Sequence, residues 1–202
     1  GIDAIEEAVK VSDEFLASSF NGALLVATVV ILSFLGLYYS GNKLVDRAKS
    51  SPYSKPAALG LMIAIGIGLH NFGEGLAIGA ALGLGQIAFS RFLIVGFALH
   101  NTSEGFAIAA PMAKGKPMII KLFAMGMIAG TPAIFGAWIG GFAYSPFTAI
   151  VFLSIGAGAI FQVIVAILKW IREEGDKDLS RASVVAGIAT GMLIMYLTSI
   201  LV

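Results

Sequence analysis

Long runs of apolar residues, separated by short polar connections, form the main pattern of this chain. Six stretches approach the roughly 20 apolar residues that a helix needs to cross a bilayer: 22–39, 57–83, 89–112, 118–142, 147–170 and 183–202. We predict helices because lipid admits only helices or closed barrels, and the alternating pattern of barrel strands is absent from the sequence. The expected fold is an all-α, polytopic bundle with six transmembrane helices, forming a single transmembrane domain over residues 1–202.

The polar connections differ in charge. Residues 1–21 are acidic, and we expect an extracytoplasmic connector there, with a short amphipathic helix. All of the 13 Lys and Arg except Lys10 and Arg91 lie in or beside the first, third and fifth connections: Lys43, Arg47, Lys49, Lys55, Lys114, Lys116, Lys121, Lys169, Arg172, Lys177 and Arg181. Positively charged loops stay in the cytoplasm. We therefore expect a multi-pass protein of the cell membrane (plasma or inner), with both ends of this chain extracytoplasmic.

Composition supports the membrane prediction. Hydrophobic residues make up 58% of the chain and charged residues 12%, against about 25% charged residues in soluble domains. A soluble enzyme, a disordered chain and a nucleic-acid binder are excluded on this ground, and the net charge of +1 suggests no polyanionic partner. The absence of cysteine excludes thiolate chemistry and cysteine metal sites.

Glycine is abundant, with 25 residues, and much of it recurs at close spacing inside the apolar stretches. Small residues let membrane helices approach closely. We predict close helix packing at these positions and a homodimer through glycine-rich faces. The positions are Gly66, Gly68, Gly75, Gly79, Gly83, Gly105, Gly136 and Gly140.

The deeply placed ionisable residues fall in only two stretches. Of the 12 acidic residues, only Glu74 and Glu104 lie in the middle of an apolar stretch, and so do the only two histidines, His70 and His100. An ionised carboxylate at that depth costs at least about 2.5 kcal/mol. Such residues therefore need a partner or a function.

These residues belong to a repeated motif. The pattern H-N-x-x-E-G-x-A-I occurs at 70–78 and again at 100–108, a separation of 30 residues. Because consecutive spans run in opposite directions, we expect the two copies to form an inverted-repeat pair. Such pairs commonly hold a substrate site at the bilayer midplane.

The spacing within the motif predicts a metal site. Positions i, i+1 and i+4 share one face of a helix, so two such faces offer two imidazoles, two carboxylates and two amide oxygens. This set suits Zn²⁺, Fe²⁺, Co²⁺ or Mn²⁺ better than Cu⁺, Ca²⁺ or Mg²⁺. Two carboxylates also balance one divalent cation. The predicted ligands are His70, Asn71, Glu74, His100, Asn101 and Glu104.

At these residues the chain resembles the ZIP (Zrt/Irt-like) family of divalent-metal transporters. The resemblance is specific over 66–111 and elsewhere depends on topology. It implies transport toward the cytoplasm of zinc above all, with iron, manganese, cobalt or cadmium as alternatives. The metal is then a transported substrate, and no cofactor is expected. The family has eight membrane helices, so we expect that this chain lacks the first two and begins after them.

The chain departs from the family pattern at three positions. Gly73 and Ser103 stand where many members have proline, and Thr131, followed by Pro132, stands where many have glutamate. Without that third acid we predict one bound metal ion at a time. Thr131, Gln162 and Ser103 are secondary ligand candidates, and Pro132 leaves the carbonyl of Ile128 without a helical donor.

Two other functions are compatible with the same residues, although we expect no enzyme. An intramembrane metal-dependent hydrolase needs an open zinc position and a general base, but the H-E-x-x-H motif is absent. A pathway for protons or monovalent cations is the other alternative, and the paired imidazoles disfavour it. ATP-driven pumping by this chain is disfavoured because it has no Walker motif.

Overall fold

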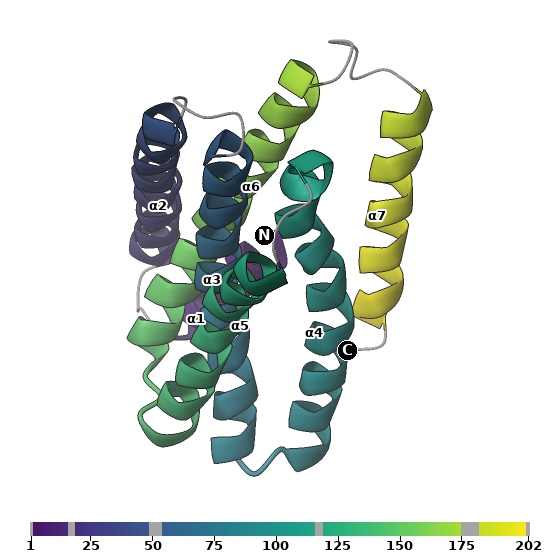
Figure 1. Ribbon diagram of the computed structural model, residues 1–202. Coiled ribbons are helices and arrows are strands. Elements are labelled where there is room, and N and C mark those ends of the chain that lie inside the picture. Colours follow the sequence, from purple (N-terminus) through teal and green to yellow (C-terminus); the bar gives the residue numbers. More distant parts are fainter. Residues whose placement is uncertain (1, 16–18, 49–53, 116–118, 175–181, 201–202) are drawn as a thin grey trace.

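The computed structural model describes residues 2–15, 19–48, 54–115, 119–174 and 182–200. This part of the chain is helical, without strands (Figure 1), so the all-α prediction is confirmed for it. The elements are α1 (Ile2–Phe15), α2 (Ser19–Arg47), α3 (Ser54–Gly83), α4 (Ile87–Ala109), the 3-10 helix η2 (Ala110–Gly115), α5 (Ile119–Phe142), α6 (Pro146–Glu174) and α7 (Ala182–Ile200).

Five helices, α2 to α6, are long and apolar enough to cross a membrane. They contain the first five predicted spans almost entirely, and they indicate a multi-pass membrane protein. The predicted span 89–112 continues beyond α4 into η2, whereas α2 and α6 extend past their predicted ends into the polar connections. Backbone hydrogen bonding continues beyond the last apolar residue. A prediction from hydropathy alone therefore places the ends of these helices too early.

The sixth predicted span coincides with α7, but the apolar stretch described there, Ala182–Ile194, is shorter than a full crossing. Six crossings and the side of the membrane that each end faces therefore stay predictions. Residues 118, 201 and 202 of the predicted spans lie outside the described residues. So do Gly1 and the loop residues Lys49, Lys116, Lys177 and Arg181.

Helix α3 lies at the centre of the bundle and contacts α2, α4, α5 and α6. Its closest neighbour is α5, and glycine lines their contact from both sides. A Cβ atom added at Gly75 or Gly79 would overlap the backbone of α5, and one added at Gly136 or Gly140 would overlap the backbone of α3. The two backbones therefore touch directly, as small residues allow in membranes.

Most of the predicted glycine packing positions are confirmed. Besides the α3–α5 contact, Gly66 lies against Val163 of α6, and Gly83 lies close to Gly141 of α5. The prediction is wrong for Gly105, because a Cβ added there would meet no atom of the described residues within 4 Å. The glycine of the second motif copy thus lies on an open face of α4.

A tight turn joins α3 to α4 into a helical hairpin. Gly85 has a φ of 74°, in the left-handed region that glycine adopts without steric cost. The amide groups of Leu84 and Gln86 donate to carbonyls of the last turn of α3, at 3.0 and 2.9 Å, which is a common way to end a helix. This turn brings the two motif copies to adjacent, oppositely running helices.

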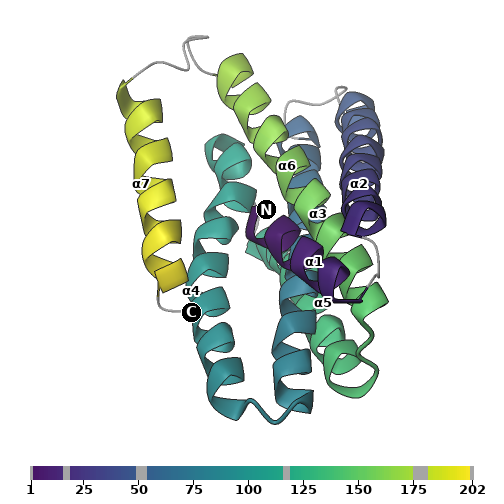
Figure 2. The same ribbon diagram turned by 180° about the vertical axis from the view of Figure 1, so that it is seen from behind.

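Helix α1 is amphipathic and packs against α6 and α2 (Figure 2). Its buried side includes Ala8 and Ser12, and Ser12 Oγ donates to the carbonyl of Val9 at 2.8 Å. Glu6 and Glu7 lie on its exposed side. The predicted amphipathic helix near the N-terminus is confirmed.

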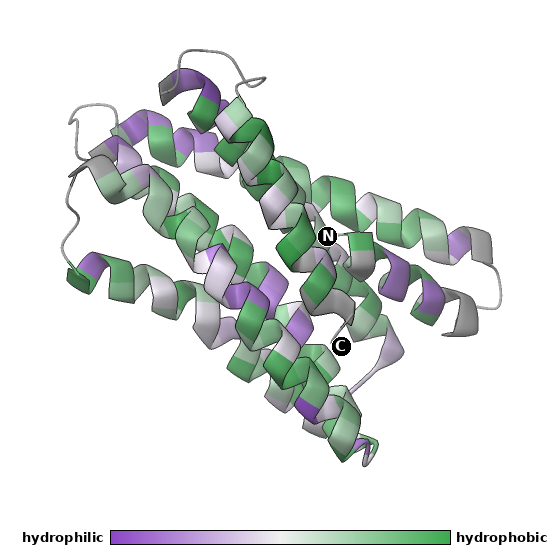
Figure 3. Ribbon diagram, turned by 90° about the vertical axis from the view of Figure 1, so that its right-hand side faces the viewer, coloured by the Kyte–Doolittle hydropathy of each residue, from purple (hydrophilic) through white to green (hydrophobic). Residues whose placement is uncertain are grey.

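The distribution of hydrophobic and hydrophilic residues over the helices is that of a membrane protein. Figure 3 shows hydrophilic residues near helix ends, on α1 and in a patch midway along the bundle, with hydrophobic residues over most of the remaining surface. Exposed large apolar side chains occur on α2, α4, α5 and α7, as expected for surfaces that face lipid. The two motif copies, 70–78 and 100–108, place hydrophilic residues inside α3 and α4.

Candidate metal centre

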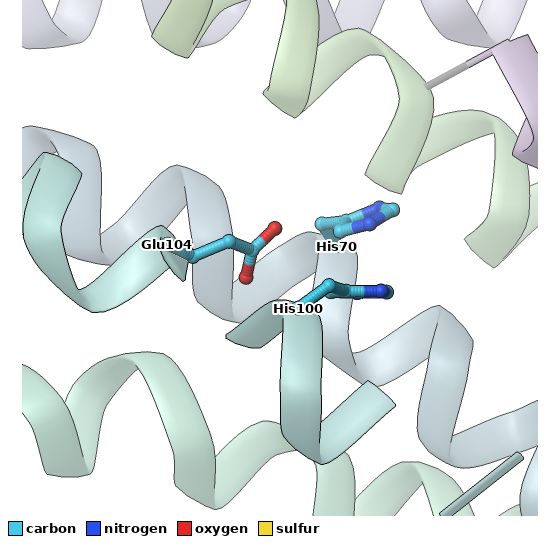
Figure 4. A group of neighbouring side chains, drawn as sticks. All are labelled: His70, His100 and Glu104. Carbon is cyan, nitrogen blue, oxygen red and sulfur yellow. The ribbon is translucent and has the colours of Figure 1, made fainter. Parts of the chain in front are cut away.

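The six predicted ligands lie on facing stretches of α3 and α4, and we call them the midspan cluster. The first motif copy contributes His70, Asn71 and Glu74, and the second contributes His100, Asn101 and Glu104. Figure 4 shows His70, His100 and Glu104 converging between the two helices. The i, i+1, i+4 spacing and the short hairpin turn together produce this convergence.

Three residues of the midspan cluster bring ligand atoms close enough to share one ion. One ligand atom from each of His70, His100 and Glu104 lies within 4.8 Å of the other two. Tetrahedral Zn²⁺, with bonds of about 2.0 Å, separates its ligand atoms by about 3.3 Å. Separations within 4.8 Å therefore allow these three residues to share one ion after small side-chain rotations.

Glu74 is the hydrogen-bonding centre of the midspan cluster. Its Oε1 lies 2.5 Å from His100 Nε2 and 3.5 Å from His70 Nε2, and its Oε2 accepts from Asn101 Nδ2 at 3.2 Å. The Glu74 side chain is only 7% exposed. These bonds join α3 to α4 across the site and fix the orientation of His100 and Asn101.

Asn71 links the midspan cluster to a third helix. Its Nδ2 donates to the carbonyl of Ala129 on α5 at 3.2 Å, and its side chain is 3% exposed. Because the amide nitrogen is used in this way, the Oδ1 atom is the one left for a ligand. Ala129 lies within one turn of Pro132, whose ring disturbs regular hydrogen bonding in a helix.

The midspan cluster has an excess of buried hydrogen-bond acceptors. Asn71 Oδ1, Asn101 Oδ1 and Glu104 Oε2 are shielded from solvent and have no hydrogen-bond partner among the described residues. Leaving a buried polar atom unpaired costs about 1–3 kcal/mol, and more for a charged group. All three atoms are oxygens, which are suitable ligands for a divalent cation.

The secondary candidates do not join this arrangement. Ser103 Oγ donates to the carbonyl of His100 on its own helix at 2.6 Å. Gln162 lies on α6, where its Nε2 donates to Met62 Sδ at 3.3 Å. Thr131 is half-buried on α5, and no hydrogen bond between described residues joins it to the midspan cluster.

The carbonyl of Ile128 contacts α3 at a residue that is not one of the six predicted ligands. It faces Gly68 on the side of α3 that packs against α5. The carbonyl of Ala129, which accepts from Asn71, was not predicted from the sequence. Pro132 was the available signal, since it indicates irregular backbone in this part of α5, but it does not say which carbonyl meets a neighbouring side chain.

Comparison with known proteins adds no further assignment. No protein-family model, no curated protein and no solved structure matches this chain. The geometry of the midspan cluster and the motif that builds it therefore carry the functional interpretation.

Proposed function

We propose that this protein transports divalent transition-metal ions across a membrane, with the midspan cluster as a transient binding site. One observation carries the proposal: His70, His100 and Glu104 bring ligand atoms within 4.8 Å of one another in the middle of helices long enough to span a bilayer. The same cluster holds three buried oxygens that have no hydrogen-bond partner among the described residues. Carboxylate, amide and imidazole groups together favour Zn²⁺, Fe²⁺, Co²⁺ or Mn²⁺. The resemblance of the repeated motif to the ZIP family supports the same function and favours zinc moving toward the cytoplasm.

Each residue of the midspan cluster has a role in this proposal. His70, His100 and Glu104 replace part of the hydration shell of the ion. For His100 to bind the ion through Nε2, its contact with Glu74 must break, and the carboxylate of Glu74 then becomes available to the ion. Metal binding competes with protons for such groups, so protonation of a carboxylate promotes release.

The direct test is metal uptake into liposomes that contain the reconstituted protein and a metal-sensitive dye. We expect Zn²⁺, Fe²⁺ or Mn²⁺ to enter faster than Mg²⁺, which gives up its hydration shell reluctantly and prefers oxygen ligands. The double variant Glu74→Ala/Glu104→Ala should reduce this uptake more than about 100-fold, since it removes both midspan carboxylates. Stoichiometric metal binding without uptake would contradict transport and favour the hydrolase.

The charge of the site sets the expected stoichiometry. Two carboxylates balance one divalent ion, whereas two ions would leave a net charge of +2 at low dielectric. We expect one Zn²⁺ per chain after dialysis, measured by elemental analysis of the purified protein. A reproducible value of two that falls to zero in the double variant would show that both ions bind at the midspan cluster and that the charge argument is wrong.

A further inference from the structure

Helix α5 contains none of the six predicted ligands, yet its backbone reaches the midspan cluster close to a proline. Pro132 lies inside α5, and a proline within a helix removes the hydrogen bond to the carbonyl four residues before it. That carbonyl belongs to Ile128, and the next one belongs to Ala129. In membranes, neighbouring helices commonly satisfy the backbone groups that a proline leaves free. Here the neighbouring helix is α3.

Two successive carbonyls of α5 meet α3 beside this proline. The carbonyl oxygen of Ile128 faces Gly68, where an added Cβ would lie 2.6 Å from that oxygen and 3.3 Å from the Pro132 ring. The carbonyl of Ala129 accepts from Asn71 Nδ2 at 3.2 Å. Gly68 and Asn71 are three residues apart and share one face of α3. The lack of a side chain at Gly68 therefore lets α5 come close enough for the Asn71 hydrogen bond.

This hydrogen bond determines which atom of the Asn71 amide remains for a ligand. A backbone carbonyl only accepts hydrogen bonds, so Nδ2 must point toward Ala129, and a reversed amide would place two acceptors together. Asn71 is 3% exposed, and its Oδ1 is buried without a hydrogen-bond partner among the described residues. The orientation of the amide oxygen is therefore fixed before an ion arrives.

The asparagine of the second motif copy is held in a different way. Asn101 Nδ2 donates to Glu74 Oε2 at 3.2 Å, and in the proposed function the carboxylate of Glu74 itself turns to the ion. The group that holds Asn101 therefore moves during binding. The group that holds Asn71 is a backbone atom of α5, which packs directly against α3. Asn71 can thus keep its hydrogen bond both with and without metal.

We propose, resting on metal binding at the midspan cluster as proposed above, that Pro132 is a positioning residue for this site. It interrupts the hydrogen bonding of α5 so that the carbonyl of Ala129 holds the Asn71 amide and leaves its oxygen to bind the ion. Pro132 itself touches no metal. Groups that orient metal ligands typically contribute about 10- to 100-fold to metal affinity. Helix α5 thus belongs to the metal site through its backbone.

Pro132→Ala tests this role because it restores the backbone N–H and lets α5 complete its own hydrogen bonds. We expect the Kd for Zn²⁺, measured by calorimetric titration, to rise about 10-fold. The Tm of the chelator-treated protein should stay the same or rise, since alanine favours a helix more than proline does. A merely structural role would lower the Tm and the affinity together. Pro132→Ser also restores the N–H and should show the same loss of affinity, including where Pro132→Ala does not yield folded protein.

Pro146→Ala is the matched control. Pro146 is the first residue of α6, where a helix does not need the N–H that proline lacks. The Kd of this variant for Zn²⁺ should equal that of the wild type. An equal rise in Kd for Pro146→Ala and Pro132→Ala would overturn the proposal, because the effect would then not depend on the contact between α5 and Asn71.

A double-mutant cycle with Asn71→Leu shows whether Pro132 acts through Asn71. Asn71→Leu removes the amide and should weaken Zn²⁺ binding about 100-fold. In that background Pro132→Ala should have no further effect, because the group that it positions is gone. A further loss of about 10-fold in the double variant, or an unchanged Kd in both Pro132 variants, would overturn the proposal. A wild type that binds no Zn²⁺ would overturn the proposed function, and this role of Pro132 with it.

Discussion

Glu104→Gln is expected to weaken Zn²⁺ binding about 100-fold without lowering the Tm of the metal-free protein. Glu104 Oε2 is buried and has no hydrogen-bond partner among the described residues. In the proposed function the carboxylate binds the metal ion, but this oxygen accepts no hydrogen bond that would stabilise the fold. The amide keeps the size of the side chain and removes a buried charge, which is costly without a partner. Calorimetric titration with Zn²⁺ and thermal unfolding of the chelator-treated protein measure the two effects.

Glu74→Gln is the matched comparison, because Glu74 occupies the same motif position on α3. Its carboxylate contacts His100 and accepts from Asn101, so an amide there places a donor against a donor. We expect this variant to lose about 1–3 kcal/mol of stability without metal, which corresponds to a fall in Tm of about 3–8 °C. Equal Tm values for the two variants would show that the carboxylates are equivalent and that this division of roles is wrong.

Gly75→Ala is expected to cause a larger loss of stability than either charge-removing variant. A Cβ at Gly75 would overlap the backbone of Ala133, and a backbone cannot rotate away as a side chain can. The two central helices would have to separate along their contact, at a cost of about 3 kcal/mol or more. We expect a Tm lower by about 8 °C or more, or aggregation during size-exclusion chromatography.

Gly105→Ala tests whether this effect comes from packing and not from the motif itself. Gly105 is the motif equivalent of Gly75, but it faces open space. Alanine is favoured over glycine within helices by up to about 1 kcal/mol, so this variant should be as stable as the wild type or slightly more stable. A large loss in Gly105→Ala, with none in Gly75→Ala, would contradict the α3–α5 contact described above.

Much of the fold could be predicted from sequence because membrane helices are specified by local composition. The first five apolar stretches predicted α2 to α6, and the repeat at 70–78 and 100–108 predicted that α3 and α4 would carry the polar groups. The helix ends were less predictable, because helices continue into water wherever the backbone geometry permits.

The unequal roles of the two motif copies could not be predicted. Both copies contain His, Asn, Glu and Gly at the same spacing. Their surroundings differ because α3 lies inside the bundle and α4 lies at its edge. The neighbours of α3 explain why Gly75 is packed and Gly105 is open, and why Asn71 reaches the carbonyl of Ala129 on α5. Such differences depend on tertiary contacts that neither motif encodes by itself.

The short turn at Gly85 also bears on how the protein enters its membrane during synthesis. Helices α3 and α4 are the least hydrophobic of the five long helices, and each carries a histidine and a carboxylate near its middle. Alone, either helix would be a poor substrate for the translocon. Joined by a tight turn, they can form the contacts of Glu74 with His100 and Asn101 before meeting lipid. Membrane insertion of α3 and α4 should therefore be cooperative, whereas the more hydrophobic α6 can integrate alone.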